Sequence, residues 1–72
     1  MAEAEIDKIR EYVSDVWPEK DIEDIEENVE ELVSNKYTTL DAVKKIKSNE
    51  HLTFYGGKLP LRFRFLIKYN NQ

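Results

Sequence analysis

Hydrophobic residues recur at helical spacing along the first half of the chain. Two segments, residues 3–17 and 19–33, share the apolar offsets 0, 3, 7, 10 and 11, and charged residues fill most other positions. This spacing places the apolar side chains on one face of a helix. They are Ile6, Ile9, Val13, Val16 and Trp17 in the first segment and Ile22, Ile25, Val29, Leu32 and Val33 in the second. We predict two amphipathic helices, near residues 4–17 and 19–34, that pair as a hairpin.

Local signals bound these helices. Pro18 separates them, because proline disfavours helical backbone in the preceding residue and is tolerated in the first turn of the following helix. Ser34-Asn35 is typical of a helix end, where asparagine tolerates the left-handed conformation. A third helix is predicted near residues 39–49. It starts at a capping box of Thr38 and Asp41, and its narrower apolar face consists of Leu40, Val43 and Ile46.

The pattern changes to alternation near the C-terminus. Gly56-Gly57 is a two-residue hairpin signal, and from Leu59 to Tyr69 every second residue is hydrophobic. We predict a β-hairpin that turns at these glycines, although Pro60 cannot donate the ladder hydrogen bond expected there. The fold class is therefore α+β, with three helices followed by a C-terminal β-hairpin in a single domain over residues 1–72. The core is predicted to contain Ile6, Ile9, Val13, Val16, Ile25, Val29, Leu32, Val43, Ile46, Phe54, Leu61, Phe63 and Phe65.

This order of elements leaves two architectures open. It is compatible with a winged-helix module, in which the third helix enters the major groove of DNA and the hairpin forms the wing. It is equally compatible with a three-helix bundle capped by a ribbon. The second helix is long for a compact winged helix, and the short strand usual between the first two helices is not visible. The winged-helix reading rests on element order alone.

Composition excludes several kinds of chemistry. The 72 residues include no cysteine and one histidine, His51, so disulfides, thiolate zinc sites and paired-histidine metal sites are ruled out. We expect no metal and no cofactor. No serine is accompanied by a convincing base and oxyanion loop, so we expect no enzymatic activity. No apolar run approaches a membrane span, and the acidic N-terminus lacks the pattern of a signal peptide. An intracellular protein, cytoplasmic or nuclear, is expected, without a membrane partner.

Charge is strongly segregated along the chain. Residues 1–35 contain thirteen acidic and three basic side chains, whereas residues 36–72 contain two acidic and eight basic ones. The respective net charges of −10 and +6 sum to the whole-chain value of −4. Segregation of this kind indicates a charged partner, or else two halves that attract each other on folding. Within the acidic half, the run Asp21–Glu31 is interpreted as a solvated helix face, with mimicry of a nucleic-acid backbone as the alternative.

A basic surface in the second half is the predicted partner-binding site. Cations on alternate strand positions would form a row that an anionic partner can follow, the third helix would extend it, and an aromatic ring would be available for stacking. The predicted binding residues are Lys58, Arg62, Arg64, Lys68, Tyr55, Lys44, Lys45 and Lys47. The alternative is that this face packs on the acidic helices or meets water.

The last strand offers a second binding surface. Its alternation continues past the part that the hairpin can pair, so residues 63–69 would present an open edge. We predict that this edge, with Phe63, Phe65, Ile67 and Tyr69, pairs in a homodimer or adds to a partner's sheet, unless Arg64 and Lys68 keep it solvated. The expected function is a non-enzymatic interaction module, a small regulator, subunit or inhibitor that binds another protein. The alternative is a winged-helix nucleic-acid-binding domain that uses the basic third helix and hairpin.

Overall fold

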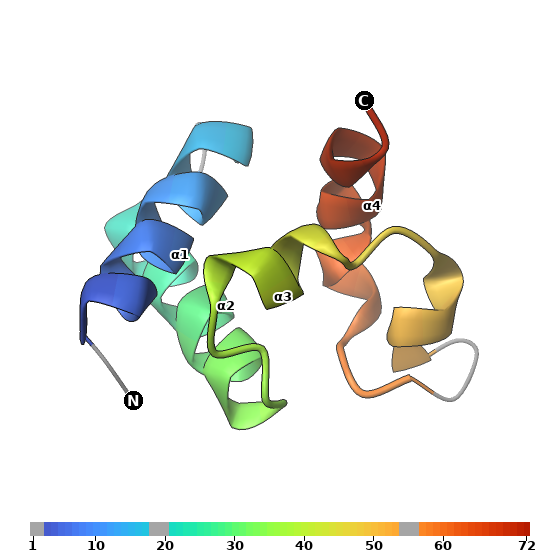
Figure 1. Cartoon of the computed structure of the whole chain (residues 1–72), viewed down its shortest axis with the longest axis horizontal. Helices are drawn as coiled ribbons and strands as arrows, with labels where there is room; N and C mark the ends of the chain where they lie inside the picture. Colours follow the sequence, from blue (N-terminus) through green and yellow to red (C-terminus); the bar gives the residue numbers. More distant parts are fainter. Residues whose placement is uncertain (1–2, 18–20, 54–56) are drawn as a thin grey trace.

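Four α-helices and two 3₁₀ turns make up the described part of the chain, residues 3–17, 21–53 and 57–72 of a computed structural model (Figure 1). Helix α3 lies between the paired helices α1 and α2 on one side and α4 on the other. In chain order the elements are α1 (Glu3–Val16), α2 (Ile22–Ser34), α3 (Leu40–Lys44), a 3₁₀ turn (Asn49–His51), a second 3₁₀ turn (Leu61–Phe63) and α4 (Arg64–Asn70).

Helices α1 and α2 form and pair as predicted, but α2 begins at Ile22 instead of near residue 19, and Ile22 of its predicted apolar stripe is 78% exposed. Their apolar stripes face each other, and Ile9 and Val13 of α1 are buried together with Val29 and Leu32 of α2. Asp21 caps α2, since its side chain accepts a hydrogen bond from the backbone N–H of Asp24 at 2.9 Å. The expected role of Pro18 falls on residues 18–20, which lie outside the described part of the chain.

The third helix is shorter than predicted. It begins one residue later than the capping box suggests, because Thr39 rather than Thr38 accepts a hydrogen bond from Ala42 N–H. It ends at Lys44 instead of near residue 49. The reason is tertiary: the side chain of Asn70 donates to the carbonyl oxygens of Val43 at 3.0 Å and Ile46 at 2.8 Å. A continuing helix would have bonded these carbonyls itself.

The predicted C-terminal β-hairpin, and with it the α+β class, is wrong. Residues 61–70 are helical, and no strand forms among the residues that the structure describes. The buried side chains Leu59, Phe63 and Leu66 are spaced four and three residues apart, which is helical spacing. Hydrophobic residues in this segment also occur at every second position, so its pattern is compatible with a strand as well as with a helix. Pro60 directly precedes the 3₁₀ turn, where its fixed φ of −60° and missing N–H do no harm.

The described residues show no antiparallel pairing of the kind that a hairpin requires, and the one isolated bridge that they form is parallel. A single bridge joins Leu52 to Leu59, with Thr53 N–H donating to Leu59 O at 2.8 Å. A hairpin that turned at Gly56-Gly57 would place Leu52 opposite Leu61, and this register is wrong. The predicted strand edge at residues 63–69 is also wrong, because Phe63 ends the 3₁₀ turn and residues 64–69 lie in α4. Phe54, Tyr55 and Gly56 lie outside the described residues, so the turn itself is not tested.

Most of the predicted core is confirmed. Leu61 is the clear error, because it is 46% exposed. Phe54 lies outside the described residues, and Ile6, Val16 and Phe65 are partly buried against the core. Three leucines that are absent from the predicted core are fully buried: Leu52, Leu59 and Leu66. The confirmed core residues are Ile9, Val13, Ile25, Val29, Leu32, Val43, Ile46 and Phe63.

Candidate anion-binding groove

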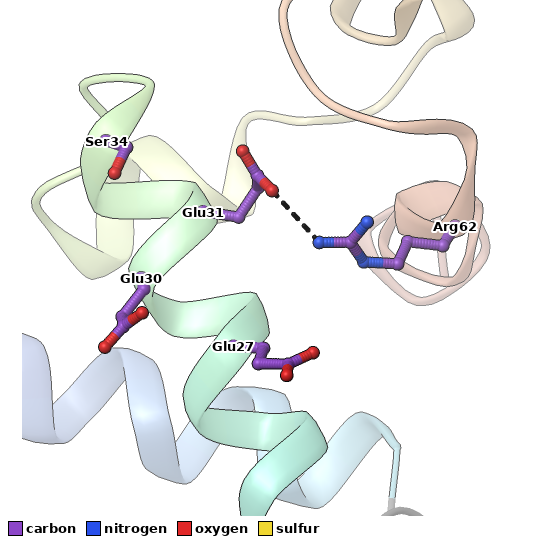
Figure 2. A pocket seen from close by; sticks show the side chains of 5 residues that line it. All are labelled: Glu27, Glu30, Glu31, Ser34 and Arg62. Atoms are coloured by element: carbon purple, nitrogen blue, oxygen red, sulfur yellow. Dashed lines mark hydrogen bonds and ion pairs between the residues drawn. The ribbon is translucent and has the colours of Figure 1, made fainter.

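The predicted row of cations along one strand does not form, because Lys58 lies in a loop, Arg62 in the 3₁₀ turn Leu61–Phe63, and Arg64 and Lys68 in α4. Arg62 is turned toward acidic helix α2. Its Nε donates to Asn28 Oδ1 at 3.0 Å, and its Nη2 lies 3.1 Å from Glu31 Oε1. Figure 2 shows Glu31 pointing across the gap toward Arg62, while Glu30 lies on the opposite side of α2. Arg62 is therefore a structural residue that joins the two halves of the chain.

Four other predicted cations are distributed over α3, its following loop and α4. Lys44 Nζ lies 5.6 Å from the centre of the Tyr12 ring, and Lys68 Nζ lies 5.8 Å from that of Tyr69. Both distances are typical of cation–π contacts. Lys47 and Arg64 are exposed, and neither forms an ion pair with a carboxylate in the described part of the chain. Tyr55 lies outside the described residues.

The remaining two predicted lysines, Lys45 and Lys58, meet in a groove together with Lys36. The groove has a volume of about 480 Å³ and is bounded by the end of α2, by α3, by the 3₁₀ turn Asn49–His51 and by residues 57–58. All three lysines are exposed, and none pairs with a carboxylate among the described residues. The groove is lined by Asn35, Lys36, Tyr37, Ala42, Lys45, Glu50, His51, Gly57 and Lys58.

Lys36 reaches the groove through an unusual backbone conformation. Its φ is 76°, and no other non-glycine residue among those described has a positive φ. The N–H of Lys36 bonds to Val33 O at 3.0 Å and that of Tyr37 to Leu32 O at 2.9 Å, the two bonds of a Schellman motif. Glycine is the usual residue at this position, and a side chain there costs about 1 kcal/mol. The sequence had indicated Asn35 for the left-handed conformation, and this is wrong, because Asn35 has φ −97°.

Gly57 shapes the opposite wall of the groove. Its N–H donates to Leu52 O at 2.8 Å, and a Cβ at this position would lie only 2.3 Å from the carbonyl carbon of His51. The backbone can make this approach only without a side chain. The close approach brings Lys58 beside His51 at the edge of the groove. Gly57 is therefore needed for packing between two backbone segments, whatever the conformation of the turn before it.

An aromatic pair forms part of the groove wall. The hydroxyl of Tyr37 lies 3.2 Å from Nδ1 of His51, with the rings edge to face at 6.4 Å between centroids. Burial raises the pKa of Tyr37 above its usual value, so the hydroxyl stays protonated at neutral pH. Among the described residues that line the groove, Glu50 is the only acidic one. With His51 neutral, three lysines and one glutamate leave a net charge of +2 on the lining, which suits an anionic ligand.

Two further pockets, of about 260 Å³ and about 360 Å³, lie along α2, and glutamates and one arginine supply the charged groups of each. No three His, Asp or Glu side chains within residues 3–17, 21–53 and 57–72 are grouped as metal ligands would be. None of the helices in these ranges has the length and apolar character needed to cross a membrane. The chain matches no known family model, and comparisons with curated proteins and with solved structures found no significant similarity. The groove is therefore interpreted from its own chemistry.

Proposed function

We propose that the protein is a non-enzymatic interaction module that binds an acidic segment of a partner protein in the groove between Lys36, Lys45 and Lys58. The observation that carries this proposal is the left-handed conformation of Lys36. A residue held where glycine is favoured destabilises the fold, and backbone strain of this kind is concentrated at functional sites. At this position the lysine side chain lines the groove with two further unpaired lysines.

The groove favours a short acidic peptide over a nucleic acid. The wing on which the nucleic-acid alternative depended is not formed by the described residues, and α3 has five residues, little more than one helical turn. The molecule is 30 Å along its longest axis. A duplex carries about one negative charge per 1.7 Å and would extend from the groove past the acidic helices α1 and α2, which repel it. A peptide of a few residues avoids them.

The proposal is tested by fluorescence anisotropy with a dye-labelled oligo-aspartate peptide. The matched pair of variants is Lys45→Gln, which removes a groove charge, and Lys44→Gln, which removes the same charge from the neighbouring residue over the Tyr12 ring. We expect Lys45→Gln to weaken binding about threefold to tenfold, and Lys44→Gln to change it less than about twofold. Binding should weaken as salt rises, because the Debye length falls from about 10 Å at 0.1 M to about 3 Å at 1 M.

Three outcomes would contradict the proposal. Equal losses in Lys44→Gln and Lys45→Gln would mean that bulk charge, and not the groove, attracts the peptide. Tighter binding of a single-stranded DNA of the same net charge would favour the nucleic-acid alternative. Absence of peptide binding at low salt would remove the proposed function altogether.

A further inference from the structure

We propose that binding in the groove is coupled to protonation of His51, so that the affinity for an acidic ligand rises as the pH falls through the range in which histidine titrates. This inference rests on the proposed function, because it concerns the same groove. It assigns His51 a regulatory role that the sequence alone did not indicate. His51 is the only histidine in the chain, so any change in histidine charge occurs in the groove.

The position of His51 supports this role. It ends the 3₁₀ turn Asn49–His51, is half-buried, and lines the groove. Its Nδ1 faces the hydroxyl of Tyr37 at 3.2 Å. In the tautomer that carries its proton on Nε2, neutral imidazole accepts a hydrogen bond from this hydroxyl, whereas imidazolium donates to the hydroxyl oxygen, so the contact persists in either state. No hydrogen bond of Nε2 is formed within the described part of the chain, which leaves Nε2–H available to donate to a ligand.

Charged groups on every side of His51 determine the direction of the coupling. Lys36 and Tyr37 line the groove from the α2–α3 connection, Lys45 from the end of α3, and Lys58 from the segment after Gly57, while Glu50 precedes His51 in its own turn. The lining therefore carries three ammonium groups and one carboxylate besides the imidazole. A carboxylate-bearing ligand offsets the lysine charges, so the imidazolium form is favoured in the complex. By linkage, the protein with protonated His51 binds such a ligand more tightly.

Few other side chains interfere in this pH range. Aspartate and glutamate titrate near pH 4 and lysine near pH 10, whereas histidine titrates near pH 6.5. An oligo-aspartate probe therefore stays ionised between about pH 6 and about pH 8. A change in its affinity over this range reports on the protein.

The test measures the dissociation constant of the oligo-aspartate peptide at about pH 6 and about pH 8 for the wild type and two variants. We expect the wild type to bind about threefold to tenfold more tightly at the lower pH. His51→Gln, which keeps a polar side chain beside Tyr37 but cannot titrate, should lose this dependence. Tyr37→Phe, which removes the hydrogen bond but keeps the imidazole, should retain it. The histidine ring proton signal in an NMR titration should move its midpoint upward when peptide is added.

The outcomes separate the coupling from the proposed function. If the wild type binds the peptide equally well at both pH values, or if His51→Gln keeps the pH dependence, the coupling is overturned while the groove remains a binding site. An NMR midpoint that does not move upward with saturating peptide likewise overturns the coupling. If the wild type binds no peptide at either pH, the proposed function fails first.

Discussion

Arg62 Nε donates a hydrogen bond to Oδ1 of Asn28, the one buried polar residue among those described, at a distance of 3.0 Å. Asn28 lies on α2 and is only 2% exposed. The contact joins residues 34 positions apart and holds the 3₁₀ turn Leu61–Phe63 against α2. An arginine that the sequence assigned to partner binding thus satisfies a buried amide within the fold.

Removal of this donor should destabilise the protein. Arg62→Ala leaves the carbonyl of the Asn28 side chain buried without its partner, which costs about 1–3 kcal/mol in free energy of unfolding. The exposed ion pair with Glu31 adds little. Urea denaturation measures the change, and Arg64→Ala, an exposed arginine on α4, is the control with an expected change within about 0.5 kcal/mol. Equal effects of the two substitutions would contradict the role of Arg62.

Two leucines distinguish the helical C-terminal segment from the predicted strand. Leu66 is fully buried and Leu61 is 46% exposed, whereas the strand pattern placed Leu61 on the apolar face and Leu66 on the basic one. Leu66→Ala should cost about 2–5 kcal/mol, because it leaves a cavity in the core. Leu61→Ala should cost less than about 1 kcal/mol. Thermal or urea unfolding of both variants measures these costs. A larger cost for Leu61→Ala than for Leu66→Ala would favour the strand over the helix.

Asn70 should be more important for stability than its neighbour Asn71. The side chain of Asn70 donates to the carbonyls of Val43 and Ile46 and accepts a hydrogen bond from the Tyr12 hydroxyl. Asn70→Ala should therefore cost about 1–3 kcal/mol. Asn71 also donates two hydrogen bonds to carbonyls, but it is exposed, so water can replace them and Asn71→Ala should have a smaller effect. The rate of amide hydrogen exchange at the end of α3 is a second measurement. It should increase in Asn70→Ala but not in Asn71→Ala.

Lys36→Gly should have opposite effects on the stability of the fold and on the affinity for the peptide. Glycine relieves the left-handed strain at φ 76° but has more conformational freedom to lose on folding, so we expect a net stabilisation of about 0.5–1 kcal/mol. The same substitution removes a groove charge and should weaken oligo-aspartate binding. Denaturation and anisotropy on one sample measure both effects. A variant that is stabilised and binds as well as the wild type would show that the strain at Lys36 does not serve the groove.

Alkaline pH should destabilise the protein in part through Tyr37. Burial raises the pKa of Tyr37 in the folded state, while tyrosine in the unfolded chain titrates near pH 10. The unfolded state therefore releases this proton first, and stability that is intact below about pH 10 is lost as the pH rises through the folded-state value. Tyr37→Phe should lose less stability than the wild type between about pH 9 and about pH 11, measured as urea midpoints. An equal loss would contradict the assignment.

The first two helices could be predicted from the sequence because their determinants are local. The apolar stripe through Ile9 and Val13, the matching stripe through Val29 and Leu32, and the cap at Asp21 all act within one or two helical turns. The segregation of charge is likewise a property of the sequence. Part of the groove that we propose as a binding site followed from it, since Lys45 and Lys58 are among the residues that the sequence predicts to bind a partner.

Tertiary structure decided the rest. The apolar residues from Leu59 onward fit both a strand and a helix, and helix was selected by contacts with distant residues, Arg62 with Asn28 and Asn70 with Ile46. Those contacts also end α3 early and remove Arg62 from the basic surface. Lys36 and His51 enter the groove only because a helix end and a close backbone approach at Gly57 bring them together. Contacts between side chains that are distant in the sequence form through tertiary packing, and the periodicity of hydrophobic residues carries no information about which of these contacts form.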